Sequence, residues 1–281
     1  MDVNKIHFYP KNKYLRFVLK NIVYPIVIVS TIFYLISYLM LLKTDKIAVV
    51  DNTSVYVNDD MTENRDSIIK YVKCGIERVR KKGIETDLNA KIVFCRTAIE
   101  YNARCISLSV NAFARTRCFM HRVILSPIKK HTSVNNRYKP ENQIDTVFAP
   151  RYYDEIISHE LTHIYQYEKL SMIAFCHCSL FEKWKIEGYA DYIGGASSMR
   201  IALGEKMFLE GKYSNESLEI YESFFVNYFV GRLRTDYLLN FKKIQEDEYW
   251  RTSYDVDKLD EEIRVVLRSG EYKIFRQNDY E

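Results

Sequence analysis

The sequence predicts an α+β fold preceded by one N-terminal transmembrane helix. Short runs of apolar residues typical of strands recur between residues 47 and 126, whereas apolar residues recur at helical spacing from residue 152 onward. An uncharged run of 21 residues precedes both regions. The chain has 281 residues, of which 47% are hydrophobic, so it is large enough to bury a full core and is not disordered.

The uncharged run extends from Ile22 to Leu42. A helix of this length, rising 1.5 Å per residue, spans about the 30 Å of a bilayer's hydrocarbon core. A cleavable signal peptide is the alternative, but the run is longer than a usual signal core and lacks an Ala-x-Ala-like cleavage site. We therefore expect residues 22–42 to be an uncleaved anchor, with residues 1–21 before it and a folded domain over 43–281.

Cations are distributed unevenly about this anchor. Five Lys or Arg residues precede it, and Lys43 and Lys46 follow it. The positive-inside rule predicts a single-pass protein with a basic cytoplasmic N-terminus and an extracytoplasmic domain, either periplasmic or extracellular. The five cations and Asp2 also account for the whole formal charge of +4, which leaves zero for the rest. This balance gives no indication of a nucleic-acid partner.

The six cysteines would then lie in an oxidising compartment, where disulfides can form. Six cysteines allow 15 pairings, and the sequence does not choose among them. Cys176-His177-Cys178 also looks like a metal-binding cluster. Because no second Cys/His pair follows at zinc-finger spacing, disulfide or core roles are preferred.

The first part of the domain combines strands with one long helix. Alternation and turn residues predict strands over 47–51, 54–57, 91–95 and 121–126, and a helix over 62–82 that Gly83 closes. Residues 97–118 are ambiguous between helix and irregular structure. Residues 127–150 are polar and are expected to form a long surface loop, either a lid or a solvated connector.

The second part is expected to be helical. Residues 152–169 contain neither Gly nor Pro, and their apolar residues recur at helical spacing. Further helices are expected over 184–192, 215–230, 235–246 and 257–267, the last capped by Asp255 or Asp257. The domain would thus divide into an α+β part (43–170) and a helical part (171–281), with a cleft between them.

The helix over 152–169 carries His159-Glu160-Leu161-Thr162-His163. Positions i and i+4 lie on one helical face, so His159 and His163 can offer two imidazole nitrogens to one metal ion. Glu160 projects beside that ion, where a general base would act on a water whose pKa zinc can lower to about 7. The motif therefore predicts one Zn²⁺ ion.

A catalytic zinc usually keeps three protein ligands and one open position. The candidate for the third ligand is Glu187, in the segment Glu187-Gly188-Tyr189-Ala190-Asp191, 24 residues after His163. Asp191 lies one turn later on the same helical face, where its carboxylate can accept the free ring N–H of a ligand histidine. The small residues around Glu187 would let the two helices approach closely.

These residues resemble the gluzincin metallopeptidases, in which two histidines of one helix and a glutamate of the next bind zinc. His159, Glu160, His163 and Glu187 match that pattern, and Asp191 matches the acidic partner found in thermolysin-like members. The resemblance covers roughly residues 123–267. It implies a zincin-like fold, with a small mixed sheet, an active-site helix and a helical C-terminal part.

The resemblance also implies roles for two later features. In many small gluzincins a tyrosine of the following helix faces the metal, which points to Tyr221 as a catalytic oxyanion stabiliser with Tyr228 behind it. In zincins an edge strand above the active-site helix can pair with an extended peptide. Residues 121–126 are the candidate for that strand by position.

The function implied is that of a membrane-anchored zinc metallopeptidase acting on peptide or protein substrates, with Glu160 as general base. One alternative is a membrane-anchored binding or scaffold protein that keeps the zinc site without catalysis. Glu160 argues against it, because a structural zinc site has no use for a base beside an open position. The other alternative is a zinc hydrolase of a non-peptide amide.

Overall fold

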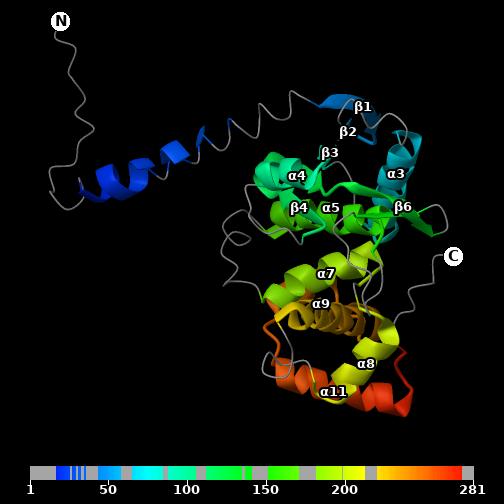
Figure 1. Ribbon diagram of the computed structural model, residues 1–281. Coiled ribbons are helices and arrows are strands. Elements are labelled where there is room, and N and C mark those ends of the chain that lie inside the picture. Colours follow the sequence, from blue (N-terminus) through cyan, green and yellow to red (C-terminus); the bar gives the residue numbers. More distant parts are fainter. Residues whose placement is uncertain are drawn as a thin grey trace, which may run out of the picture. The chain divides into compact units, whose positions relative to one another are not determined.

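The structure is a computed structural model that describes residues 17–25, 27–29, 31–32, 35, 44–57, 65–84, 88–105, 112–134, 137–140, 151–170, 182–197, 199–212 and 220–273. Contacts divide the chain into two units, Met1–Asp45 and Lys46–Glu281. Figure 1 shows the elements of each unit.

The first unit contains the π-helix η1 (Leu19–Val23) and further helical residues up to Leu35. The hydroxyl of Thr31 donates to the carbonyl of Val27 at 2.8 Å, so this polar side chain is satisfied by the helix itself. Most of the predicted anchor over 22–42 lies outside the described residues. Within the described part, no helix combines the length and the apolar character that crossing a bilayer requires. The anchor therefore stays a prediction.

The second unit is an α+β domain, as predicted. Its five-stranded mixed sheet has the order β1-β2-β3-β5-β4. Strand β2 is parallel to β3 and β3 to β5, whereas β4 is antiparallel to β5. The strands are β1 (Asp45–Val50), β2 (Thr53–Val57), β3 (Lys91–Phe94), β4 (Ala114–Arg117) and β5 (Arg122–Leu125).

The first two strands are joined by Asp51 and Asn52, whose φ angles are 46° and 62°. Two consecutive left-handed residues are typical of a type I′ turn, which matches the twist of a hairpin. Asp and Asn tolerate this conformation better than other non-glycine residues. The predicted break near Asn52 is thus confirmed as a tight turn.

The central strands are buried on both faces. Ile92, Phe94, Val123 and Leu125 face the main core, which is shared with α3 (Arg65–Lys81) and α5 (Tyr153–Leu170). Ile124 points to the opposite face, where it packs against α4 (Ala98–Cys105). This alternation follows from the period of two along a strand.

Helix α3 ends at Lys81 and, as predicted, is closed by Gly83, whose φ is +81°. A Cβ at Gly75 would lie 2.7 Å from Cγ2 of Ile157, so the backbone of α3 packs directly against a side chain of α5. Helix α5 is buried along most of its length because further helices cover its other side.

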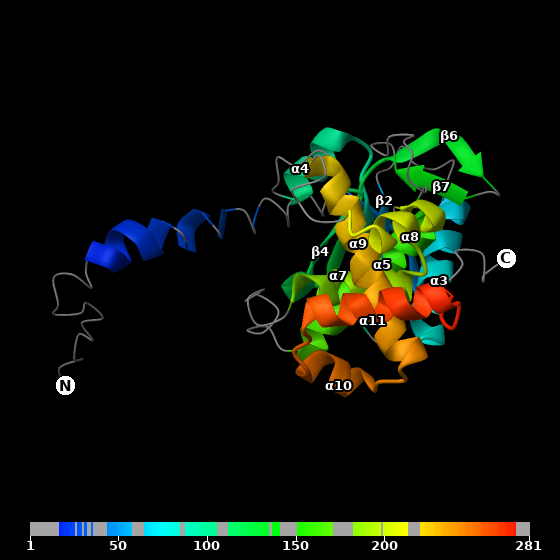
Figure 2. The ribbon, with the colours of Figure 1, turned by 90° about the horizontal axis from the view of Figure 1, so that it is seen from below.

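Those helices are α7 (Lys183–Gly194), α8 (Ile201–Leu209), α9 (Ile220–Asp236), α10 (Glu246–Arg251) and α11 (Val256–Ser269). In Figure 1 the layers follow one another from the sheet through α5, α7 and α9 to α11, and Figure 2 views this stack from the α11 side. The predicted cap is confirmed, since the Asp255 carboxylate accepts from the backbone N–H of Lys258 at 3.3 Å.

Three sequence predictions need correction. The helix expected over 235–246 is not separate, because α9 continues into the π-helix η4 (Tyr237–Phe241) and a new helix begins at Glu246. Within the expected loop 127–150, the strands β6 (Ile128–Val134) and β7 (Arg137–Pro140) form a small antiparallel hairpin. Residues 97–118, which the sequence left ambiguous, contain both a helix, α4, and a strand, β4.

The third correction concerns the edge strand. Residues 121–126 do form a strand, β5, but it lies between β3 and β4. All four residues of β5 are buried, as expected of an interior strand covered on both faces. Among the described strands the edge on this side is β4, whose Arg-Thr-Arg sequence lacked the apolar alternation that predicts a strand.

Four cysteines are described, and all are free thiols: Cys74, Cys95, Cys105 and Cys118. The other two, in the Cys176-His177-Cys178 segment, lie outside the described residues.

Candidate metal centre

Two glycines set the position of α7, the helix that carries Glu187. A Cβ at Gly194 would lie 3.0 Å from the carbonyl oxygen of Glu155 and 3.5 Å from Cβ of His159. The expected close approach of α7 to α5 is therefore confirmed at this residue. Gly188 does not face α5; it faces α9, where a Cβ would lie 2.3 Å from the carbonyl oxygen of Gly231.

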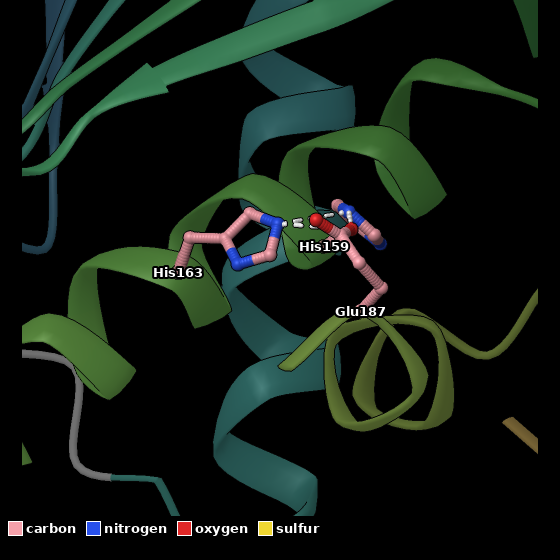
Figure 3. A group of neighbouring side chains, drawn as sticks. All are labelled: His159, His163 and Glu187. Carbon is pink, nitrogen blue, oxygen red and sulfur yellow. Dashed lines mark hydrogen bonds and ion pairs between the residues drawn. The ribbon is translucent and has the colours of Figure 1, made fainter. Parts of the chain in front are cut away.

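Three potential ligand atoms converge between α5 and α7 (Figure 3). Nε2 of His159 and Nε2 of His163 are 3.1 Å apart. Oε2 of Glu187 lies 3.4 Å from the first nitrogen and 3.5 Å from the second. The structure thus brings together the three residues that the sequence predicts as metal ligands.

Hydrogen bonds fix which ring nitrogens carry protons. Nδ1 of His159 lies 2.7 Å from Oδ1 of Asp191, and a carboxylate can only accept, so this nitrogen donates. Nδ1 of His163 lies 2.8 Å from Oε1 of Gln166. The Gln166 amide nitrogen donates to the carbonyl of Ile186 at 2.9 Å, which orients its oxygen toward the histidine.

When the rings are neutral, both Nε2 atoms therefore present lone pairs to each other and to a carboxylate oxygen. Three acceptors at such short distances repel one another unless a cation or protons lie among them. In a tetrahedral zinc site with ligand distances of about 2.0–2.2 Å, ligand atoms are separated by about 3.3 Å. The observed separations of 3.1, 3.4 and 3.5 Å fit this arrangement.

The electrostatics of the three residues agree with a cation site. Burial favours the neutral ring of His159, but the carboxylates of Asp191 and Glu187 outweigh it and raise its pKa to about 9. Burial likewise opposes charge on His163, whose pKa is nevertheless raised by Glu187. Burial would raise the pKa of Glu187, yet the two imidazoles hold it well below its usual range.

Asp191 is fully buried beneath the first histidine, and Nη2 of Arg151 lies 2.8 Å from its Oδ1. The same carboxylate oxygen therefore accepts from a ring N–H and faces a guanidinium. Arg232 lies nearby; burial lowers its pKa to about 10, against the opposing effect of Asp191 and Asp236. A buried carboxylate needs such compensating positive charge.

Glu160, the predicted base, is buried beside the ligands and is held by the edge strand. The hydroxyl of Thr116 in β4 lies 2.5 Å from Oε2 of Glu160 and 3.0 Å from its backbone oxygen. Strand β4 therefore runs directly past this carboxylate.

Tyr228 of α9 completes the surroundings. Its ring stacks against that of His159 with centroids 6.1 Å apart and an interplanar angle of 23°. Burial raises its pKa well above the usual value, and the carboxylates of Glu187 and Asp191 raise it further. The phenol thus stays protonated and can donate. The backbone of Tyr221 lies two turns earlier in α9, and its side chain is outside the described part, so its predicted role stays a prediction.

Sequence reasoning missed three side chains of this site: Gln166, Thr116 and Arg151. Gln166 has a local signal, because it follows His163 at i+3 on the same helix. Thr116 and Arg151 reach the site from other parts of the chain, and no local pattern marks such contacts.

Comparison with known proteins finds no counterpart: no family model matches the chain, and neither the curated proteins nor the solved structures yield a match.

Proposed function

We propose that this chain is a membrane-anchored, zinc-dependent peptidase with a zincin-like domain. The observation that carries the proposal is the convergence of His159, His163 and Glu187 at zinc-ligand separations, with Glu160 adjacent. A site that only stabilised the fold would be expected to close its fourth position with another protein ligand. Among the described residues the metal-ligand group has three members.

In the proposed reaction, His159, His163 and Glu187 hold the zinc ion. When bound, zinc supplies Lewis acidity that polarises a carbonyl and makes water a better nucleophile. Glu160 accepts the proton of the attacking water and delivers it to the leaving nitrogen. Asp191 and Gln166 keep the two rings oriented by holding their Nδ1 protons.

Tyr228 is the side chain that we propose as donor to the developing oxyanion. Its hydroxyl stays protonated and its ring lies against that of His159. A donor fixed before the reaction stabilises negative charge as it forms. Tyr221, implied by the family resemblance, remains the alternative for the same role.

The substrate would bind as an extended strand along β4. This strand is the edge among the described strands of the sheet, and its Thr116 touches Glu160. An extended peptide can add to such an edge through main-chain hydrogen bonds. The substrate-binding role that position suggested for residues 121–126 is therefore assigned to residues 114–117.

The anchor over 22–42, its orientation and the extracytoplasmic location of the domain belong to the same proposal. They rest on the uncharged run and on the cations before it.

The test combines metal analysis with a peptide library. The purified full chain should carry one zinc per molecule, and a chelator should abolish cleavage of the library. Glu160→Gln should keep zinc and lose hydrolysis, whereas His163→Ala should lose both. Zinc retained without cleavage of any peptide would favour a scaffold protein or a non-peptide amide as substrate. Absence of bound zinc would overturn the proposal.

A further inference from the structure

The outer edge of β4 presents backbone groups at defined residues. The N–H of Ser126 donates to the carbonyl of Phe113 at 3.0 Å, which makes these two residues a hydrogen-bonded pair. Such pairs alternate along an antiparallel ladder. Arg115 and Arg117 therefore bond to β5, opposite Ile124 and Arg122, and the backbone groups of Ala114 and Thr116 point outward.

Side chains alternate in the perpendicular direction. Thr116 points to the face of the sheet where α5 lies, since its hydroxyl reaches Glu160. Arg115 and Arg117 belong to the opposite face, toward α4. Nη2 of Arg117 donates to the carbonyl of Cys105 at the end of α4. Burial raises the pKa of the Cys105 thiol to about 11, although the guanidinium groups of Arg115 and Arg117 lower it.

Arg115 and Arg117 place positive charge beside the outer edge of β4. Arg115 is partly exposed and forms no ion pair with any residue that the structure describes. Arg104, in the last turn of α4, differs because the carboxylate of Glu100 lies 2.7 Å from its guanidinium. The hydrogen bond from Arg117 to the carbonyl of Cys105 is not an ion pair and does not neutralise the charge of Arg117. Two cations two residues apart therefore lie along one face of the strand.

We propose that β4 selects peptides with acidic side chains at two positions separated by one residue. The inference rests on the proposed function and names its substrate class. In a peptide strand paired with β4, the residue opposite Thr116 lies on the Glu160 side. Its two neighbours then lie on the other face, directly opposite Arg115 and Arg117. Cross-strand pairs on one face approach closely enough for carboxylates and guanidinium groups to interact.

The first experiment compares cleavage of three peptides that differ only at these two positions, with Glu-x-Glu, Gln-x-Gln or Lys-x-Lys. Each exposed ion pair is worth a few tenths to about 1 kcal/mol, so for two pairs we expect kcat/KM to be roughly three- to thirtyfold higher for Glu-x-Glu than for Gln-x-Gln. The preference should shrink as salt rises. Equal kcat/KM for the Glu and Gln peptides would overturn the inference.

The variants are Arg115→Glu and Arg115→Gln, with Arg251→Glu as a matched reversal of an exposed arginine on α10. Arg115→Glu should abolish the preference, because each charged peptide then meets one attractive and one repulsive side chain, and Arg115→Gln should reduce the preference for the Glu peptide. Arg251→Glu should retain it. Thermal unfolding of each variant shows whether it folds. If Arg115→Glu does not fold, the result for Arg115→Gln decides the test. A full acidic preference in folded Arg115→Gln would contradict the assignment.

Binding to Glu160→Gln, measured by fluorescence anisotropy with the same labelled peptides, separates this inference from the proposed function. If the wild-type chain cleaves none of the library, the peptidase proposal fails. The inference still stands if Glu-x-Glu binds more tightly than Gln-x-Gln and Arg115→Gln weakens that difference. It fails if the two peptides bind equally.

Discussion

The carboxylate of Asp191 lies 2.7 Å from Nδ1 of His159 and 2.8 Å from the guanidinium of Arg151, through the same oxygen atom. This contact fixes the ring so that its other nitrogen faces His163 and Glu187. The geometry of the metal centre is therefore set by a buried ion pair as well as by its ligands.

Replacing this carboxylate should weaken zinc binding. Asp191→Asn removes the charge that holds the His159 ring, and loss of such a partner typically lowers metal affinity by about 10–100-fold. Competition with a chromogenic chelator measures the change. Asp260→Asn is the control, since Asp260 is equally buried and pairs with Arg234 at 2.7 Å away from the ligands. It should lower the free energy of unfolding but leave zinc affinity unchanged. An equal loss of zinc affinity in both variants would contradict the assigned role.

Zinc affinity should rise with pH. The pKa of His159 is about 9 in the metal-free fold, above its ordinary value of 6.5, so the ring carries a proton near neutrality that zinc must displace. Displacing one proton raises the apparent affinity by about tenfold per pH unit below this pKa. We expect a rise from pH 7 to 9 that levels off above 9, and a flat profile would refute it.

The free energy of unfolding of the metal-free chain should fall as pH rises, whereas the zinc affinity rises. A raised pKa means that the folded state binds the proton more tightly than the unfolded state. The contribution of His159 is therefore fully present below pH 6.5 and is lost as pH rises through about 9. Urea unfolding in the presence of a chelator measures it. Asp191→Asn isolates the contribution of His159, because Asp191 raises the pKa of that ring. The free energy of unfolding of the variant should therefore fall less as pH rises.

Removing the Thr116 hydroxyl should slow the proposed hydrolysis. Thr116→Val keeps the shape of the side chain but loses the bond to Oε2 of Glu160, and a hydrogen bond to a charged group is worth about 1.5–3 kcal/mol. We expect kcat to fall at least about tenfold with zinc affinity unchanged. Thr162→Val is the control, since that hydroxyl donates to the backbone of Ser158 within α5. An equal fall in kcat for both would indicate a general disturbance of α5.

The crossing of α7 and α9 should not tolerate a methyl group. In Gly188→Ala the new Cβ would lie 2.3 Å from the carbonyl oxygen of Gly231, a distance that only backbone movement can relieve. We expect a loss of about 3 kcal/mol in the free energy of unfolding. Gly83→Ala is the comparison, because its Cβ meets nothing within 4 Å and only the φ of +81° is strained. It should lose about 1–2 kcal/mol. Equal losses would show that crowding at the crossing is not the cause.

The metal ligands were predictable because their pattern is local. His159 and His163 are one turn apart, and Glu187 and Asp191 repeat that spacing on the next helix. The main strands and helices were predictable for the same reason, since each carries its own periodicity. The close approach of α5 and α7 was also anticipated, because small residues such as those around Glu187 permit two helices to touch where they cross.

The parts that were not predictable depend on contacts between distant segments. The edge position of β4 is determined by its pairing with β5 and not by its Ala-Arg-Thr-Arg sequence. Helix α8 was missed because its nine residues are interrupted by Gly204, whose missing side chain accommodates the ring of Phe229. Arg151 was missed because its partner Asp191 lies 40 residues later in the chain.

The glycine contact between Gly188 and Gly231 has a consequence for how this site can diversify. It fixes the helix of Glu187 against the helix of Tyr228, so substitutions on that side disturb several functional groups at once. Strand β4, by contrast, pairs with β5 through backbone bonds that do not depend on side-chain identity. New substrate preferences in descendants of this chain should therefore arise by substitution along the strand, while the helical side of the site is inherited unchanged.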